Sequence, residues 1–95
     1  MSDSIVIIPT FNERDNIEKM VYKVMSLEKK IHILFVDDSS PDGTANVVRG
    51  MQKKFSDRIH LEVRVGKLGL GTAYVHGFKW CLEKSYDLSN VYLQI

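Results

Sequence analysis

The feature that most constrains this chain is a short apolar run that ends at two adjacent carboxylates. Residues 33–36 read Ile-Leu-Phe-Val and are followed directly by Asp37 and Asp38, then by a stretch rich in turn-forming residues. This pattern predicts a buried strand, a loop and then a helix that begins near Thr44. In open α/β sheets, ligands bind beyond the carboxyl ends of the strands. The two acids therefore mark a place where a bound small molecule is expected.

The rest of the chain repeats this alternation of strand and helix. Strands are expected over residues 4–8, 31–36, 59–65 and 91–95, and helices from Asn12 to about residue 28, over 44–55 and over 72–84. This β-α-β-α-β-α-β order predicts an α/β fold with right-handed crossovers and a mainly parallel sheet. The loops 9–13, 37–44 and 65–72 would then share one edge of the sheet.

Two finer expectations concern the helices. Asn12 is a good candidate to cap the first helix, because an amide oxygen at that position accepts a backbone N–H. The third helix is expected to turn its apolar positions inward, namely Tyr74, Phe78, Cys81 and Leu82.

Composition narrows the class of partner and the compartment. The 95 residues carry a formal net charge of +1, which offers no electrostatic argument for nucleic acid or an anionic membrane as the main partner. The single cysteine, Cys81, excludes an internal disulfide and fits a reducing compartment. No stretch approaches the roughly 20 apolar residues of a spanning helix. A cytoplasmic location is expected.

The first two loops carry candidate ligand contacts. Phe11 can lie against a base or ribose beside the rigid Pro9, and Glu13 can accept hydrogen bonds from sugar hydroxyls; alternatively, Phe11 packs in the core and Glu13 only caps the helix. Asp37 and Asp38 point to opposite sides of a strand, so one is expected to face the cleft and the other to brace the loop. Alternatively, the three carboxylates of Asp37, Asp38 and Asp42 together suit a hard cation.

The third loop, residues 66–73, suits a phosphate. Its three glycines allow close backbone approach, the helix that follows offers free N–H groups, and Lys67 adds a positive charge. The loop matches neither the P-loop nor the dinucleotide-binding pattern, so a plain tight turn is the alternative. His76, on the helix after it, is a further candidate for a cleft contact.

Three stretches taken together resemble one family. Residues 5–13, 36–44 and 66–78 are similar to the family-2 inverting glycosyltransferases. The run Lys-Leu-Gly-Leu-Gly-Thr-Ala-Tyr in the third stretch resembles the polyprenyl (dolichyl) phosphate mannosyltransferase branch. The resemblance implies a GT-A fold, in which a Rossmann-like nucleotide-binding half precedes an acceptor half. It also implies transfer of mannose from GDP-mannose to a polyprenyl phosphate.

The same resemblance assigns roles to single residues. By motif position, the nucleotide-sugar-binding residues would be Pro9, Phe11, Glu13, Val36, Asp38 and Lys67, and the loop scaffold would be Asp37, Asp42, Gly43, Gly69 and Gly71. Two positions depart from the family pattern. Phe11 stands where tyrosine is usual, which removes a hydroxyl but keeps the stacking ring, and Ser39 stands where glycine is usual.

The family also implies a metal that this sequence does not provide for. Its Asp-x-Asp element, which holds Mg2+ or Mn2+ on the donor diphosphate, follows the fourth strand, and this sequence stops there, at Ile95. Residues 1–95 are therefore expected to form the nucleotide-sugar-binding half of a longer enzyme, inactive alone and without metal ligands. The full enzyme would associate peripherally with the cytoplasmic face of a membrane.

Three alternatives stay open. The chain could be a non-catalytic nucleotide-binding or assembly module that self-associates through the sheet edge at residues 91–95. It could belong to another family-2 enzyme that uses a different nucleotide sugar. Residues 34–38 also resemble the acidic strand end of signalling receiver domains, but there the acid pair ends the first strand and here it ends the second.

Overall fold

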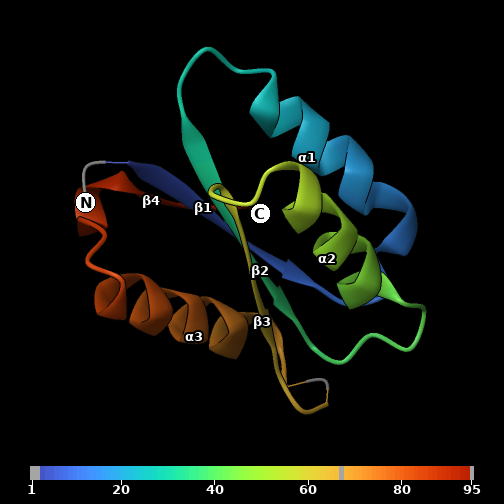
Figure 1. Cartoon of the computed structure of the whole chain (residues 1–95). Helices are drawn as coiled ribbons and strands as arrows, with labels where there is room; N and C mark the ends of the chain where they lie inside the picture. Colours follow the sequence, from blue (N-terminus) through green and yellow to red (C-terminus); the bar gives the residue numbers. More distant parts are fainter. Residues whose placement is uncertain (1–2, 67, 95) are drawn as a thin grey trace.

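The computed structural model describes residues 3–66 and 68–94, in which four strands alternate with three α-helices (Figure 1). The strands are β1 (Ser4–Thr10), β2 (Ile31–Asp37), β3 (Ile59–Val63) and β4 (Val91–Leu93). The helices are α1 (Ile17–Met25), α2 (Thr44–Lys54) and α3 (Leu70–Glu83), with short 3-10 helices η1 (Arg14–Asn16) and η2 (Leu88–Asn90) before α1 and β4. The predicted α/β alternation is confirmed.

The strands form one sheet in the order β3-β2-β1-β4, and every pairing is parallel. The predicted mainly parallel sheet is therefore confirmed. The chain builds outward from β1 to β2 and β3, then crosses back through α3 to place β4 on the other side of β1. This reversal makes the carboxyl end of β1 a switch point, the usual place for a ligand in such a sheet.

The two faces of the sheet are covered by different helices. Helices α1 and α2 lie on one face and α3 on the other (Figure 1). Because side chains alternate along a strand, Ile33 and Phe35 pack beneath α1 and α2, whereas Leu34 and Val36 pack beneath α3. The apolar run 33–36 is thus buried on both faces, as expected of a central parallel strand.

Helix α3 contacts the sheet through small residues rather than large ones. Its buried positions are Ala73, Gly77 and Cys81, and their spacing of four places them on one face of the helix. The prediction that Leu82 points inward is wrong, since its side chain is 54% exposed. Helix α3 lies so close to β1 that a Cβ added at Gly77 would lie 2.7 Å from Ile7 Cγ2, so a large side chain has no room at this contact.

Several element boundaries differ from prediction. Strand β1 continues through Pro9 to Thr10, whose carbonyl accepts a hydrogen bond from the Asp38 N–H (3.1 Å). Strand β3 stops at Val63, two residues early, and β4 ends at Leu93, before Gln94; Ile95 lies outside the described residues. Helix α3 begins at Leu70, two residues before the predicted start.

The expectation that Asn12 caps the first helix is wrong. Asn12 adopts a left-handed backbone conformation (φ 56°) and precedes η1, whose N-cap position is Glu13. The helical start has no side-chain cap of its own; its backbone N–H groups donate instead to Asp42, in the loop after β2, and to Thr44, the first residue of α2. A cap supplied from 28 to 31 residues away leaves no local sequence signal.

At the surface, β4 is an edge strand with Tyr92 52% and Leu93 42% exposed. Self-association through this edge stays a prediction. None of the helices that the described residues form has the length and apolar character needed to cross a bilayer.

Candidate functional site

The loops after β1 and β2 are bonded to each other at the carboxyl edge of the sheet. The backbone N–H groups of residues 12–14 donate in order to Ser40 Oγ (2.9 Å), Thr44 Oγ1 (3.1 Å) and Asp42 Oδ2 (3.2 Å). Asp42 also accepts from the Thr44 N–H (3.0 Å) and hydroxyl, and these bonds hold the pKa of its carboxyl below the ordinary value. The conformation of the first loop is therefore set by the second.

Asp37 lies inside this arrangement and is completely buried. Its Oδ1 accepts hydrogen bonds from Thr10 Oγ1 (2.7 Å) and Ser40 Oγ (2.6 Å), and its Oδ2 accepts from the Ser40 N–H (3.0 Å). These three donors come from β1 and from the loop after β2. The Asp37 carboxylate therefore has its hydrogen bonds within the fold and needs no ligand to satisfy it.

Asp38 points the other way and pairs with Arg64, a residue that sequence reasoning missed. The guanidinium is bidentate: Nε donates to Asp38 Oδ1 (2.7 Å) and Nη2 to Oδ2 (2.9 Å). Both residues are buried, with 8% of Arg64 and 6% of Asp38 exposed. The position of Arg64 in the sequence could have indicated its role. Arg64 directly follows β3, and the ends of parallel strands lie at the same edge of the sheet, where Asp38 also lies.

Arg64 also holds the glycine-containing loop and the start of α3. Its Nη1 donates to Thr72 Oγ1 (3.0 Å) and its Nη2 to the Gly69 carbonyl (3.2 Å). The Leu68 N–H donates to Asp38 Oδ2 (3.1 Å). One ion pair thus joins the ends of β2 and β3 to the first turn of α3.

A cavity of about 230 Å³ opens between these loops. It is lined by Pro9, Thr10, Phe11, Glu13, Asp38, Gly69, Leu70 and Ala73. Its wall combines an aromatic ring, two carboxylates and the N-terminal end of α3, where the helix dipole is positive. Such a mixture suits a ligand with a flat ring, hydroxyl groups and an anionic group.

The structure brings together four residues of the predicted binding set, namely Pro9, Phe11, Glu13 and Asp38. Val36 is completely buried in the core beneath α3 and does not line the cavity, so its contact with a nucleotide stays a prediction. Lys67 lies outside the described residues. His76 lies elsewhere and pairs with Glu62 (Nε2 to Oε1, 3.0 Å).

The predicted scaffold glycines behave differently from one another. Gly43 and Gly69 have positive φ angles of 88° and 101°, in the region that disfavours other residues, and each directly precedes a helix. Gly69 also lines the cavity. Gly71 lies in the first turn of α3, where an added Cβ would meet nothing within 4 Å, so packing does not require glycine there.

Across residues 3–66 and 68–94, no group of three or more His, Cys, Asp or Glu side chains could hold a metal ion. The three carboxylates at the end of β2 do not converge, because each is bonded to a different partner. These three carboxylates are therefore not placed to share a metal ion.

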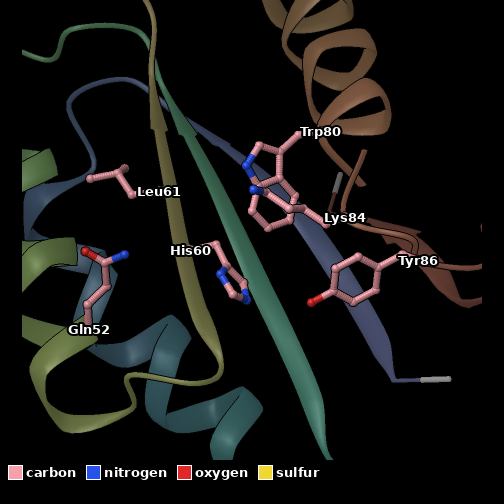
Figure 2. Close-up of a pocket in the computed structure, with 6 residues that line it drawn as sticks. All are labelled: Gln52, His60, Leu61, Trp80, Lys84 and Tyr86. Carbon is pink, nitrogen blue, oxygen red and sulfur yellow. The ribbon is translucent and has the colours of Figure 1, made fainter. Parts of the chain in front are cut away.

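A larger cavity, of about 450 Å³, lies away from the predicted site at the edge strand β3. Figure 2 shows its lining residues: Gln52, His60, Leu61, Trp80, Lys84 and Tyr86. Behind them, buried His32 lies with Nδ1 3.3 Å from His60 Nε2 and 2.9 Å from the Tyr86 hydroxyl. The two imidazole rings are nearly parallel (18°).

This histidine pair is expected to make stability depend on pH. Burial lowers the pKa of both His32 and His60 below the ordinary 6.5; Lys30 and Arg58 add to this at His32, where Asp3 and Asp57 oppose it, and Lys84 and the neighbouring imidazole add to it at His60. The unfolded chain therefore binds protons more readily, so the stabilisation is complete above pH 6.5 and is lost as pH falls below it.

Urea unfolding at about pH 7.5 and about pH 5.5 measures the effect. The free energy of unfolding should be lower at the acidic pH, and replacing both residues (His32→Gln/His60→Gln) should reduce that difference. Equal differences in the parent and the variant would contradict the assignment.

Comparison with known proteins agrees with this geometry. The glycosyl transferase family 2 model matches residues 5–86. Polyprenol monophosphomannose synthase of Mycolicibacterium smegmatis is 44% identical over 85 residues, 90% of this chain and 32% of the relative. Undecaprenyl-phosphate mannosyltransferase of Micrococcus luteus is 36% identical over 84 residues, 88% of this chain and 34% of the relative. The chain thus spans about a third of the length of these curated relatives.

The fold of this chain also matches that of a solved mannosyltransferase. The mannosyltransferase PcManGT from Pyrobaculum calidifontis, in complex with GDP-Man and Mn2+, superimposes with a TM-score of 0.76 and 26% identity, over 81% of this chain and 24% of that one. The predicted GT-A type of fold is confirmed by this match. The chain belongs to glycosyl transferase family 2.

Proposed function

We propose that residues 1–95 form the donor-nucleotide-binding portion of an enzyme that transfers mannose from GDP-mannose to a polyprenyl phosphate. The observation that carries the proposal is the cavity at the switch point, where four residues of the predicted binding set meet. The relatives support the two substrates: two are named for a polyprenol or undecaprenyl phosphate acceptor, and the solved neighbour contains GDP-Man.

In this proposal each wall of the cavity has a separate role. Phe11 and Pro9 lie against the base or ribose, and Glu13 and Asp38 accept hydrogen bonds from base N–H groups or ribose hydroxyls. The bond between Glu13 Oε2 and Asn16 Nδ2 (2.9 Å) leaves the other carboxylate oxygen of Glu13 for a ligand. Asp38 is fixed by Arg64, so its carboxylate is oriented before a ligand arrives. Lys67 and the α3 terminus would face the diphosphate.

The solved neighbour holds Mn2+, and a divalent ion, Mg2+ or Mn2+, is part of the proposal for the full enzyme. Such an ion would neutralise the GDP leaving group. Its ligands would be residues other than those described here. The 95-residue chain alone is therefore expected to bind the donor without turning it over.

Titration calorimetry with GDP, with and without Mn2+, tests the binding proposal. GDP should bind the chain, and Phe11→Ala should weaken binding by about tenfold or more, because stacking on an aromatic ring contributes about 1–3 kcal/mol per base. Glu13→Ala should weaken it as well, whereas Glu18→Ala, at an exposed position of α1, should not. Equal affinity for GDP in the Phe11→Ala and Glu18→Ala variants would contradict the proposal.

The same titration separates the alternatives. UDP that binds more tightly than GDP would indicate a family-2 enzyme with another donor. The second candidate is a non-catalytic nucleotide-binding module, which would bind GDP through the same cavity. Weak GDP binding that is no tighter for GDP-mannose would support that candidate, whereas Mn2+ should change binding in neither case, because the described residues offer no metal site.

A further inference from the structure

The cavity of about 450 Å³ at the edge strand β3 has a volume typical of sites that bind small molecules. We call it the β3 cavity. One of its walls is aromatic, since the Trp80 ring centroid lies 5.0 Å from that of His60 and 6.2 Å from that of Tyr86 (Figure 2). The planes of the Trp80 and Tyr86 rings differ by only 28°. This wall therefore offers flat faces against which a planar ring can pack.

The charge in the β3 cavity is positive. Lys84 is the charged residue among the six described residues that line it, and its Nζ lies 5.8 Å from the Trp80 ring centroid. Within the part of the chain that the structure describes, Lys84 forms no ion pair with a carboxylate. An ammonium group beside an aromatic wall is thus available to an anionic group of a ligand.

A hydrogen-bond chain behind the wall determines which ring nitrogen of His60 can accept. His32 Nε2 lies 3.3 Å from Asp3 Oδ2, without hydrogen-bond geometry, and this carboxylate favours a proton on that nitrogen. His32 Nδ1 is then the acceptor for the Tyr86 hydroxyl (2.9 Å) and for His60 Nε2 (3.3 Å). Burial raises the pKa of Tyr86 to about 12, so its hydroxyl keeps the proton that it donates. His60 therefore carries its proton on Nε2, and its Nδ1 is left as an acceptor.

We propose that the β3 cavity binds a planar aromatic anion that also carries a hydroxyl or N–H donor. The ring packs against Trp80 and Tyr86, the anionic group pairs with Lys84, and the donor bonds to His60 Nδ1. A phenolic carboxylate is a simple molecule with all three features. The β3 cavity and the donor cavity share no described lining residue, so this inference does not depend on the proposed function.

Heteronuclear NMR titration with para-coumarate tests the proposal, because this flat molecule carries a phenolic hydroxyl and a carboxylate at opposite ends. Trp80 is the single tryptophan of the chain, so its indole N–H gives one resolved signal from the cavity wall. That signal should shift saturably, with a Kd of about 1 mM or tighter. Cinnamate, which lacks the hydroxyl, should bind about fivefold more weakly, and para-coumaramide, which lacks the charge, about tenfold more weakly.

Replacement of Lys84 tests the contact with the anionic group. Lys84→Gln should weaken the binding of para-coumarate by about tenfold and leave the binding of para-coumaramide unchanged, because only the first compound is charged. Lys19→Gln is the matched control, since both lysines are exposed and Lys19 lies on α1, and it should change the affinity for neither compound. Circular dichroism should show the parent fold in both variants.

Three results would overturn the assignment: no shift of the Trp80 signal with any of the compounds, equal affinities for para-coumarate and para-coumaramide, or equal losses in the two lysine variants. Displacement of para-coumarate by GDP would overturn it as well, because the compound would then occupy the donor cavity. An affinity for para-coumarate that saturating GDP leaves unchanged would support two separate sites. A chain that binds para-coumarate in this way but not GDP would refute the proposed function and leave the β3 cavity standing as a binding site.

Discussion

Replacing Arg64 with methionine is expected to lower the free energy of unfolding by about 3–5 kcal/mol, the usual cost of leaving one partner of a buried ion pair alone. The Asp38 carboxylate would keep only the Leu68 N–H as a described donor, at 6% exposure. Thr72 Oγ1 and the Gly69 carbonyl would lose a donor each. Urea unfolding followed by circular dichroism measures the change.

Two further variants make this prediction specific. Arg49→Met removes an exposed arginine that contacts only Asn46 Oδ1 among the hydrogen bonds described, and should change stability by less than about 0.5 kcal/mol. Arg64→Lys should recover little, because an ammonium cannot reproduce a bidentate guanidinium contact. Similar losses in Arg64→Met and Arg49→Met would show that the buried pair does not stabilise the fold.

Adding Asp38→Asn to Arg64→Met should restore part of the stability, because the variant no longer buries an unpaired charge. The cycle of single and double variants then isolates the interaction between the two side chains. A double variant as unstable as the sum of the two single variants would argue that the pair is not coupled.

The layout of strands and helices was predictable because its signals are local. The run 33–36 is apolar at every position, and a strand buried on both faces needs just that; helix α2 begins at Thr44 and buries Val48 and Met51, which a period of 3.6 requires. The shared edge of the three loops followed from the parallel order, so the meeting of Pro9, Phe11, Glu13 and Asp38 could be expected from the sequence alone.

What could not be predicted depends on partners distant in the chain. The start of η1 is bonded by Thr44 and Asp42, so Asn12 carries no capping role despite its type. Arg64 belongs to the site only because it pairs with the carboxylate of Asp38, which lies 26 residues earlier in the chain. Leu82 was predicted to be a core residue because it is large and apolar. The face of α3 that contacts the sheet consists of small residues instead, and a search for large apolar residues does not identify such a face.

The two adjacent acids show how local and distant effects combine. Alternation along a strand predicted that Asp37 and Asp38 would differ in role. In the structure Asp37 is bonded to Thr10 of β1 and to Ser40 in the loop after β2, whereas Asp38 lines the cavity. Their chemistry is the same, and only their neighbours distinguish them. The binding role of Asp38 stays a proposal that GDP titration can test.

Gly77 on α3 offers the second large effect. A Cβ added there would lie 2.7 Å from Ile7 Cγ2, and Ile7 is itself completely buried in β1. Gly77→Ala is therefore expected to lower the free energy of unfolding by about 1–3 kcal/mol, because the helix must move away from the sheet or Ile7 must leave its rotamer. This loss would exceed the gain in helix propensity that alanine brings.

Gly50 provides the matched control, since it is also a helical glycine but an added Cβ there meets nothing within 4 Å. Gly50→Ala should be neutral or stabilising by up to about 1 kcal/mol. Both variants make the same glycine-to-alanine change within a helix and so gain the same helix propensity. The difference between their free energies of unfolding therefore measures the effect of close packing. If Gly77→Ala were as stable as Gly50→Ala, the close approach of α3 to β1 would not be a feature of the folded protein. If the clash with Ile7 is the cause, the double variant Gly77→Ala/Ile7→Ala should lose less stability than the sum of the two single variants, because Ile7→Ala removes Cγ2, Cδ1 and Cγ1, which would lie 2.7, 3.0 and 3.2 Å from the added carbon.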